Sequence, residues 1–469
     1  MIAMPSLSTA LPHAPSPTGS GVAASASGDA GVTTAWAHLR YGALGMPLAF
    51  VALPLYVILP AHYGDTLGVP LAALGVVLLL SRLLDAVADP VLGLWADAQL
   101  SRPGAAWRGI AAAAAVLAVG FWALFFPMVD GVTARLAWCA LSLTVTCWAF
   151  SACSITHQAW GTRLGGDATV RARWVAWREG LGLLGVLLAN GLAASLGPAA
   201  MTLALSVSLA WGVWALRRAP APASASAVEL VQGPAWLEGQ AAWSLQAWAR
   251  PLRHGEFRRL LALFLINGIA NAIPATLVVF FVRDVLQRPE MLGPCLGAYF
   301  LTGALSVPLW VRVVRRLGPS RAWALGMLAY VPAFGGVLAL GPGDVVAYAG
   351  ICLASGLMLG ADLTLPGTLL AGVIQRHDAA ARQVPHPAPH QGRSSEGIFT
   401  GWWQLATKLN LALAAGLALP ALGWLGYVPG SRDPQALWHL TLVYGALPCA
   451  LKLAAVLAWW RWWAKEGLE

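Results

Sequence analysis

Charged residues are scarce in this chain, and their scarcity excludes most soluble folds. They make up 10% of the 469 residues, whereas 58% are hydrophobic and the mean hydropathy is +0.67. A soluble globular domain carries about 25% charged residues. Apolar runs of roughly 20 residues, the length that crosses a bilayer, recur along the whole chain. The sequence therefore predicts an all-α polytopic membrane protein.

Several chemical signatures are missing as well. The six cysteines form no CxxC pair, so neither a metal site nor a disulfide framework is indicated. The absence of GxxxxGK[ST] argues against ATP-driven transport, and neither GxSxG nor HExxH occurs. The net charge of +9 does not require a nucleic-acid partner, because the basic residues cluster in short loops between apolar runs. We therefore expect no cofactor and no enzymatic activity.

Lysine is rare, and the amino-terminal segment carries no targeting signal that we recognise. Only Lys408, Lys452 and Lys465 occur among 29 basic residues, which suggests GC-rich coding and hence a bacterial source. The cytoplasmic (inner) membrane is the expected location. Residues 1–33 lack the basic start and apolar core of a signal peptide, and are predicted to form a disordered cytoplasmic tail.

Hydropathy predicts about twelve membrane spans in two halves, residues 34–216 and 257–469, separated by a cytoplasmic linker at 217–256. The expected spans lie near residues 36–60, 69–97, 109–129, 134–160, 176–198, 199–216, 257–283, 292–314, 321–341, 345–374, 396–424 and 436–463. Arginines concentrate in one set of loops, so both termini are expected in the cytoplasm.

Two short basic turns repeat at matching places in the two halves. Asp97 and the arginines Arg102 and Arg108 follow the second span, and Arg315 and Arg316 follow the eighth. Two six-helix halves related by internal symmetry are a recurring transporter plan, with substrate bound near the membrane midplane between them. We expect these five residues to hold or release a cytoplasmic gate.

Two carboxylates lie one helical turn apart inside the second span. Asp85 and Asp89 share a helix face with Arg82 and Gly93. Ionisable groups at membrane depth are costly and usually line a pathway or pair with an opposite charge. Two carboxylates this close repel, so a bound cation or a proton would relieve them. Oxygen ligands suit Na⁺, and a proton fits equally well. The alternative is a static ion pair with Arg82.

Lys408 lies well inside the eleventh span, where a lone ammonium needs a partner. The Asp85/Asp89 pair is the expected partner, and Asp362 of the tenth span or a helix carbonyl is the alternative. Trp402 and Trp403, close to Lys408 in sequence, offer stacking surfaces for a ring.

The fourth span ends in a run of polar side chains. Ser151 and Ser154 are deep enough to bind a cation or a substrate, and Gln158 lies one turn further on. His157 could act as a proton relay. The alternative for the whole run is a solvated helix end.

These motifs resemble the glycoside–pentoside–hexuronide:cation symporters, the melibiose-permease-like branch of the major facilitator superfamily. The specific part is Arg82-x-x-Asp85-Ala-x-x-Asp89-Pro90-x-x-Gly93-x-x-x-Asp97, followed by Ser101-Arg102-x-Gly104. Further matches are spread over most of residues 36–463: Tyr41-Gly42, Gly161 through Arg171-x-Arg173, Trp177-Arg178-Glu179, Glu396-Gly397, Lys408 and Gly426-Tyr427-Val428-Pro429.

The resemblance implies a twelve-helix major facilitator fold and symport by alternating access. It implies a cation site at Asp85, Asp89 and Ser151, coupling through Lys408, and a substrate contact at Arg178. The chain also departs from the family, because its acidic sugar-binding positions fall near Met46-Pro47 and Ser154, and a tryptophan position falls on Gln158. The galactoside clamp is therefore missing, while the cation machinery is kept.

We therefore predict a monomeric carrier in the lipid bilayer that couples Na⁺ or H⁺ to uptake of a small organic solute, first of all a sugar or glycoside. Arg82 and Lys408 are the expected coupling residues, and the expected substrate contacts are Ser154, Gln158, Arg178 and Trp402. A carrier of lysophospholipid or another amphiphile is an alternative, since vertebrate lysophospholipid carriers share the span-two and lysine features. Export, a membrane enzyme and a non-transporting sensor are the others.

Overall fold

The computed structural model describes residues 35–222, 245–382 and 396–462, apart from positions 53, 60, 61, 103 and 196. The predicted tail and most of the predicted linker lie outside these residues. The described part consists of helices, turns and loops, and contains no strand. Eight of its helical stretches are long and apolar enough to cross a membrane. The predicted all-α polytopic fold is confirmed.

Each of the twelve expected spans falls on helix. The first half contains α2 (Gly45–Phe50), the π-helical turns η1 (Pro54–Ile58) and η2 (His62–Thr66), α4 (Leu71–Leu100), α5 (Ala105–Phe125), α6 (Val132–Arg163), α7 (Ala168–Ser195) and α8 (Gly197–Arg217). The second contains α10 (Leu245–Arg253), α11 (Gly255–Phe280), η4 (Phe281–Val285), η5 (Pro289–Met291), α12 (Leu292–Gly335), η6 (Gly336–Ala339), α13 (Val345–Arg382), α14 (Glu396–Trp424), α15 (Pro434–Thr441), η7 (Leu442–Ala446) and α16 (Leu447–Trp462).

Two spans differ from simple helices. The first is broken into α2 and π-helical turns, in a stretch where Pro47 and Pro54 each remove a backbone donor. The eighth and ninth run together as α12, joined at Gly318, whose φ of 76° and ψ of 162° are not helical. Glycine tolerates this conformation because it has no Cβ. α12 is thus two helices meeting at a glycine, followed directly by Pro319.

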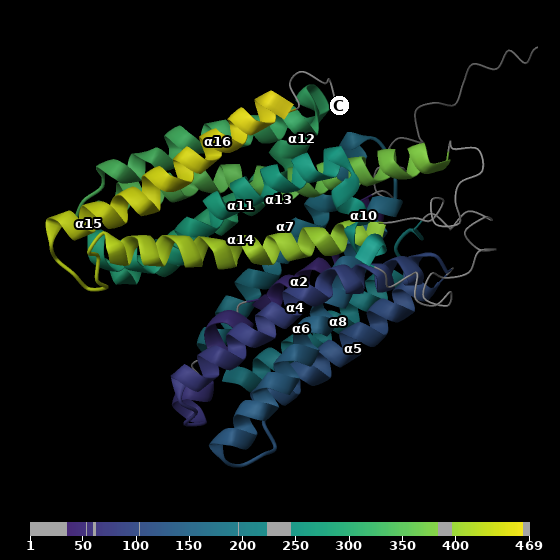
Figure 1. Ribbon diagram of the computed structural model, residues 1–469, viewed down its shortest axis with the longest axis horizontal. Helices are drawn as coiled ribbons and strands as arrows, with labels where there is room; N and C mark the ends of the chain where they lie inside the picture. The colour runs from purple at the N-terminus through teal and green to yellow at the C-terminus, as the bar shows by residue number, and fades with distance from the viewer. Residues whose placement is uncertain are drawn as a thin grey trace, which may run out of the picture.

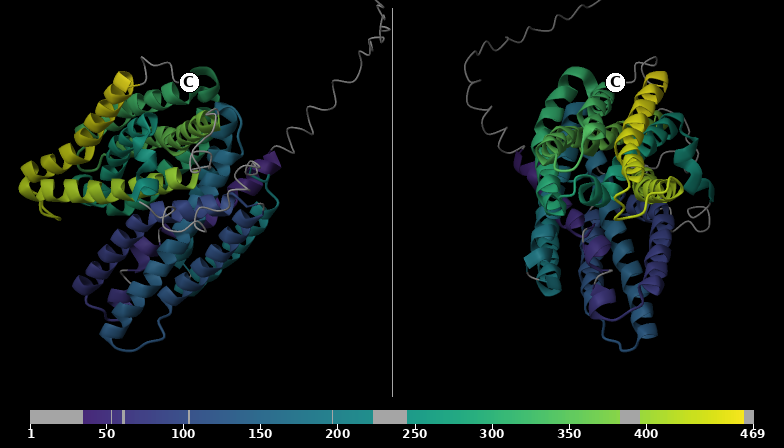
Figure 2. Two further views of the ribbon diagram at one scale, coloured as in Figure 1. Left: turned by 45° about the vertical axis from the view of Figure 1, so that its right-hand side comes forward. Right: turned by 90° about the vertical axis from the view of Figure 1, so that its left-hand side faces the viewer.

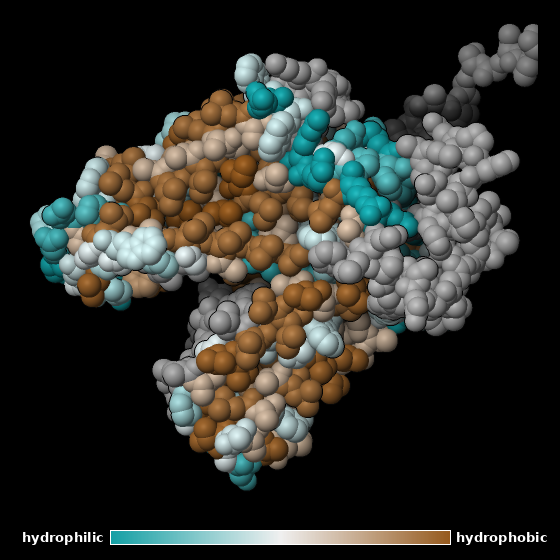
Figure 3. Space-filling view, in the orientation of Figure 1, coloured by the Kyte–Doolittle hydropathy of each residue, from teal (hydrophilic) through white to brown (hydrophobic). Residues whose placement is uncertain are grey.

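The helices form two groups arranged as a wedge (Figures 1 and 2). α4, α5, α6 and α8 lie in one arm, and α11 to α16 lie in the other. One hydrophobic core uses residues between Tyr41 and Leu216, and two further cores belong mainly to the second arm. The space-filling view shows an open cleft between the arms and a largely apolar outer surface (Figure 3).

The arms meet where α14 packs against α4 and α6, and where α7 packs against α12 and α13. Hydrogen bonds join the arms at the end that holds the carboxyl termini of α4 and α6 and the start of α14. We call this the basic end, because Arg102, Arg163, Arg171 and Arg376 lie there. The cleft in Figure 3 widens toward the opposite end, where Figure 1 places α15.

Candidate functional site: a lysine between two buried carboxylates

Four predicted side chains from three helices come together between the arms. Nζ of Lys408 on α14 lies 2.6 Å from Oδ2 of Asp85 and 2.7 Å from Oδ1 of Asp89, both on α4. It also donates to Oγ of Ser151 on α6, at 2.9 Å, and Ser151 donates to Asp85 at 3.1 Å. The structure thus places the lysine against the aspartate pair.

Glycines allow this approach. A Cβ at Gly93 of α4 would overlap the carbonyl oxygen of Gly397 on α14, and a Cβ at Gly401 would overlap that of Asp89. The two backbones therefore touch. Lys408 follows Gly401 by seven residues, about two helical turns, and so lies on the same face of α14. Asp85 and Asp89 are one turn apart on α4, which brings both carboxylates to that face.

The site around Lys408 contains more negative than positive charge among the described residues. Two carboxylates share one ammonium, and Asp89 is fully buried. Oδ2 of Asp89 is buried and has no hydrogen-bond partner in the described part of the chain. A buried acceptor without a partner costs about 1–3 kcal/mol, more when it is charged. A cation or a proton at this oxygen would remove that cost. The side chain of Arg82 lies outside the described part of the structure.

At the basic end, α4 caps α14. The Asp97 carboxylate accepts hydrogen bonds from the backbone N–H groups of Gly397 (2.5 Å) and Ile398 (3.1 Å). An anion at a helix amino terminus satisfies unpaired donors and the helix dipole. Asp97, one of the residues expected at a gate, thus links the two arms by capping α14.

A buried ion pair also joins the arms at the basic end. Arg163 of α6 lies 3.0 Å from Glu396 of α14, with side chains 4% and 8% exposed, and donates to the carbonyl of Leu100. Gln375 of α13 accepts from Arg171 and donates to the carbonyl of Thr162. Sequence reasoning missed Arg163, Glu396 and Gln375 as residues that close this end.

The four expected gate arginines are exposed, namely Arg102, Arg108, Arg315 and Arg316. The closing contacts described above use Arg163 and Arg171.

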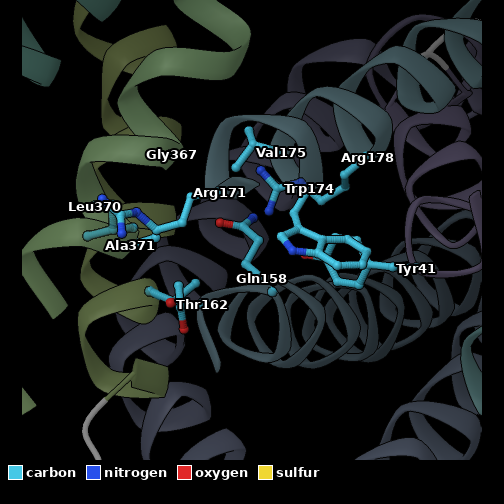
Figure 4. Close-up of a pocket in the computed structure, with 12 residues that line it drawn as sticks. Tyr41, Gln158, Thr162, Arg171, Trp174, Val175, Arg178, Gly367, Leu370 and Ala371 are labelled. Carbon is cyan, nitrogen blue, oxygen red and sulfur yellow. The ribbon is translucent and has the colours of Figure 1, made fainter. Parts of the chain in front are cut away.

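The expected substrate residues divide into two groups. Ser154 accepts from Gln404 of α14 (2.7 Å) and from Gln158 (3.3 Å), and Gln158 lines a cavity together with Arg178 (Figure 4). Trp402 is partly buried on α14 and does not line that cavity, and Trp403 stacks on Phe264 with ring centroids 3.9 Å apart.

His157, considered as a proton relay, is completely buried beside Tyr41. Its Nε2 lies 2.8 Å from the Tyr41 carbonyl oxygen, and the two rings pack with centroids 4.5 Å apart. These contacts hold the first span against α6.

A third buried ion-pair site lies within the second arm. Asp362 of α13 is bonded to Lys452 of α16 at 2.6 Å. It also accepts from Asn267 and Asn271 of α11 and from Trp323 of α12. Asp362 is therefore not the partner of Lys408. The sequence analysis did not predict this pair, although a lysine inside the last apolar span, Lys452, is a sign that a buried carboxylate lies nearby.

Comparison with known proteins assigns the class. The arrangement matches solved structures of major facilitator transporters over most of the chain. A bacterial homologue of the iron transporter ferroportin, in an outward-facing state, aligns with a TM-score of 0.65 at 15% identity, covering 92% of this chain and all of the other. The E. coli fucose:proton symporter aligns with a TM-score of 0.57 at 12% identity, covering 90% and 98%. At these identities the likeness shows the fold. The protein is a multi-pass membrane protein of this fold.

The family model described as "MFS/sugar transport protein" matches residues 40–463, and the chain belongs to that family. Curated relatives are transporters rather than enzymes. The sphingosine-1-phosphate transporter MFSD2B of Xenopus tropicalis is 25% identical over 202 residues, covering 43% of this chain and 37% of the relative. The human sodium-dependent lysophosphatidylcholine symporter 1 is 25% identical over 217 residues, covering 45% and 38%. The match spans well under half of each relative.

Proposed function

We propose that this chain is a secondary active transporter that couples Na⁺ or H⁺ to movement of a small organic solute, with sugars and glycosides as the first candidates. The observation that carries the proposal is the Lys408 ammonium between Asp85 and Asp89, with one buried Asp89 oxygen that has no partner among the described residues. Ionisable groups at membrane depth mark ion or substrate pathways. The motif around Asp85 and Asp89 also supports placement in the melibiose-permease-like branch.

Coupling would follow from competition for the carboxylates. Lys408 belongs to the second arm, while Asp85, Asp89 and Ser151 belong to the first. A cation bound by the carboxylates would weaken their hold on the ammonium, and so loosen one arm from the other. The residues that would contact solute in the cleft are Ser154, Gln158, Arg178 and Trp402.

Alternating access requires the two arms to move as units. We propose residues 34–216 and 257–469 as these units, with the basic end in the cytoplasm of a bacterial cell and both termini there. The cleft then opens to the outside. Opening the other way would break the Asp97 cap on α14 and the Arg163–Glu396 pair.

A lysophospholipid carrier is the second candidate. Two curated relatives are named for amphiphiles, sphingosine-1-phosphate and lysophosphatidylcholine. The motif positions at which the symporter family has acidic sugar-binding residues read Met46-Pro47 and Ser154 here, which removes an argument for galactosides.

Ligand-dependent thermal stability of the purified protein tests both candidates. Melibiose, methyl glucuronide and lysophosphatidylcholine would be added with and without Na⁺ at two pH values. A ligand that binds only the folded state raises the melting temperature. A Na⁺- or pH-dependent sugar response that disappears in Asp89→Asn supports the symporter. A response to lysophosphatidylcholine alone would favour the amphiphile carrier. If neither Na⁺ nor pH changes the ligand response of the wild type, coupling to a cation is contradicted.

A further inference from the structure

Arginines and tryptophans form a surface patch at the basic end of the first arm, where the start of α5 and the end of α8 meet the first span. α5 and α8 pack side by side (Figure 1), and Trp160 at the end of α6 donates to the carbonyl of Pro220, just beyond α8, at 3.0 Å. We call this surface the Arg–Trp patch. Its members, all exposed except the partly buried Trp107, are Arg40, Trp107, Arg108, Trp214, Arg217 and Arg218.

Indole rings hold three of the guanidiniums in this patch. The Cζ atoms of Arg217 and Arg108 lie 5.2 Å and 5.8 Å from the centroid of the Trp107 ring. The Cζ atom of Arg218 lies 3.9 Å from the centroid of the Trp214 ring. A guanidinium over a ring is held by its face, so the N–H groups at its edge stay available for an acceptor. The patch therefore presents positioned donors at the surface.

The positive charge of the Arg–Trp patch is not offset within the described part of the chain. Elsewhere at the basic end, Arg163 and Arg376 each pair with a glutamate. Among the described residues, none of the four arginines of the patch forms an ion pair with a carboxylate. Arg40 donates to the backbone carbonyl of Arg218, at 3.4 Å, which adds its charge to the others. An anion would find four positive charges and no competing carboxylate here.

The patch lies at the depth of the lipid headgroups. α5 and α8 are both helices of 21 residues that are apolar enough to span a membrane. Arg108 lies in the first turn of α5, and Arg217 is the last residue of α8. Trp211 and Trp214, in the last two turns of α8, are 39% and 55% exposed, as expected of tryptophans at the membrane interface. The anions at this depth are the phosphates of phospholipids.

We propose that the Arg–Trp patch binds the headgroup of an anionic phospholipid. The edges of the guanidiniums would hold the phosphate oxygens, which suit their planar donor geometry. The rings of Trp107 and Trp214 would lie beside the glycerol and the upper acyl chain, as amphipathic rings do at this level. A zwitterionic headgroup brings a cation that the four arginines repel. Free inorganic phosphate would use the arginines alone, so the exposed rings favour a lipid.

The test is native mass spectrometry of the purified full-length protein in an uncharged detergent, titrated with phosphatidylglycerol or with phosphatidylcholine. Wild type should bind the first phosphatidylglycerol more tightly than phosphatidylcholine. The double variant Arg217→Gln/Arg218→Gln should weaken that binding about tenfold or more, because two basic contacts to the headgroup are lost. The matched control Arg258→Gln/Arg312→Gln removes the same charge from exposed arginines of α11 and α12 that stand over no ring of the described residues. It should bind like wild type.

A third variant, Trp107→Leu, keeps every charge and removes the ring beside two guanidiniums, so it should weaken phosphatidylglycerol binding severalfold. Equal affinity for the two lipids, equal losses in the two double variants, or wild-type affinity in Trp107→Leu would overturn the proposal, because net charge alone would then explain the binding. Displacement of the lipid by an equal concentration of inorganic phosphate would overturn its assignment to a lipid. The measurement uses no solute and no ion gradient, so its failure is separable from failure of the proposed transport.

Discussion

Lys408 and Asp89 are 319 residues apart in the sequence, yet their charged atoms lie 2.7 Å apart, one from each arm of the transporter. The contact is therefore both an ion pair and a joint between the halves. An interaction of this kind can respond to a bound cation and change the relative stability of the two orientations of the arms.

Replacing Lys408 by methionine should make the protein more dependent on a cation. Without the ammonium, Asp85 and Asp89 repel each other at a site with no other described positive partner. Added Na⁺, or a lower pH, should then raise the melting temperature of Lys408→Met more than that of wild type. Differential scanning fluorimetry over a Na⁺ series measures this. Equal responses of the two proteins would show that the carboxylates do not bind the cation.

Alanine at Gly93 should open the basic end. Its Cβ would overlap the carbonyl of Gly397, whereas a Cβ at Gly75, also on α4, meets nothing within 4 Å. Hydrogen exchange at the amides of Gly397 and Ile398, which Asp97 holds in the closed end, should therefore speed up in Gly93→Ala. Gly75→Ala is the matched control and should exchange as slowly as wild type. Unchanged protection in Gly93→Ala would show that this contact does not keep the end closed.

The Asp362–Lys452 pair should behave as a structural centre of the second arm. Removing one partner leaves an uncompensated buried charge, which costs about 3–5 kcal/mol. Asp362→Asn and Lys452→Met should each lower the melting temperature, and the double variant should recover part of the loss. A double variant no more stable than the worse single one would argue that the charges serve a different purpose.

His254 should give the protein a component of acid sensitivity. It precedes α11 and packs beside His377, with ring centroids 5.0 Å apart. Burial lowers the pKa of His254; the Glu256 carboxylate opposes this shift and the Arg376 guanidinium adds to it. In the unfolded chain the histidine has a pKa of about 6.5, so below that pH it binds a proton more readily than in the folded chain. Stability from this residue is therefore present above that pH and lost as the pH falls below it.

His254→Gln should flatten the fall in melting temperature between about pH 7 and pH 5, the interval in which a histidine of lowered pKa exerts its effect. A series of thermal melts at matched ionic strength measures this. If both proteins lose stability with the same slope, His254 does not contribute to acid sensitivity.

The sequence predicted the fold well because its signals are local. Long apolar runs and basic loops are sufficient to place the spans, and the i, i+4 spacing places Asp85 and Asp89 on one face. The contact of Lys408 with this pair was predicted because a buried ammonium without a partner is energetically costly. The structure brings the lysine and the aspartates into contact.

The closing contacts at the basic end could not be predicted in the same way. Arg163 and Glu396 are 233 residues apart, and neither stands in a pattern that marks it as buried. The arginine-rich turns gave a stronger local signal, yet Arg315 and Arg316 are exposed. The break in the first span and the turn at Gly318 occur at or near proline and glycine residues. The direction that the backbone takes at such residues depends on packing, so the sequence alone did not predict them.

Gradient-driven accumulation in proteoliposomes tests the central claim most directly. Wild type, Asp89→Asn and the control Asp130→Asn, whose carboxylate is fully exposed, would be assayed with labelled melibiose, methyl glucuronide and lysophosphatidylcholine. Each would be offered under an imposed Na⁺ gradient and an imposed pH gradient. The account predicts that one gradient drives accumulation of at least one solute by wild type and Asp130→Asn, and that Asp89→Asn does not accumulate it. Accumulation by Asp89→Asn at the wild-type level would contradict the account.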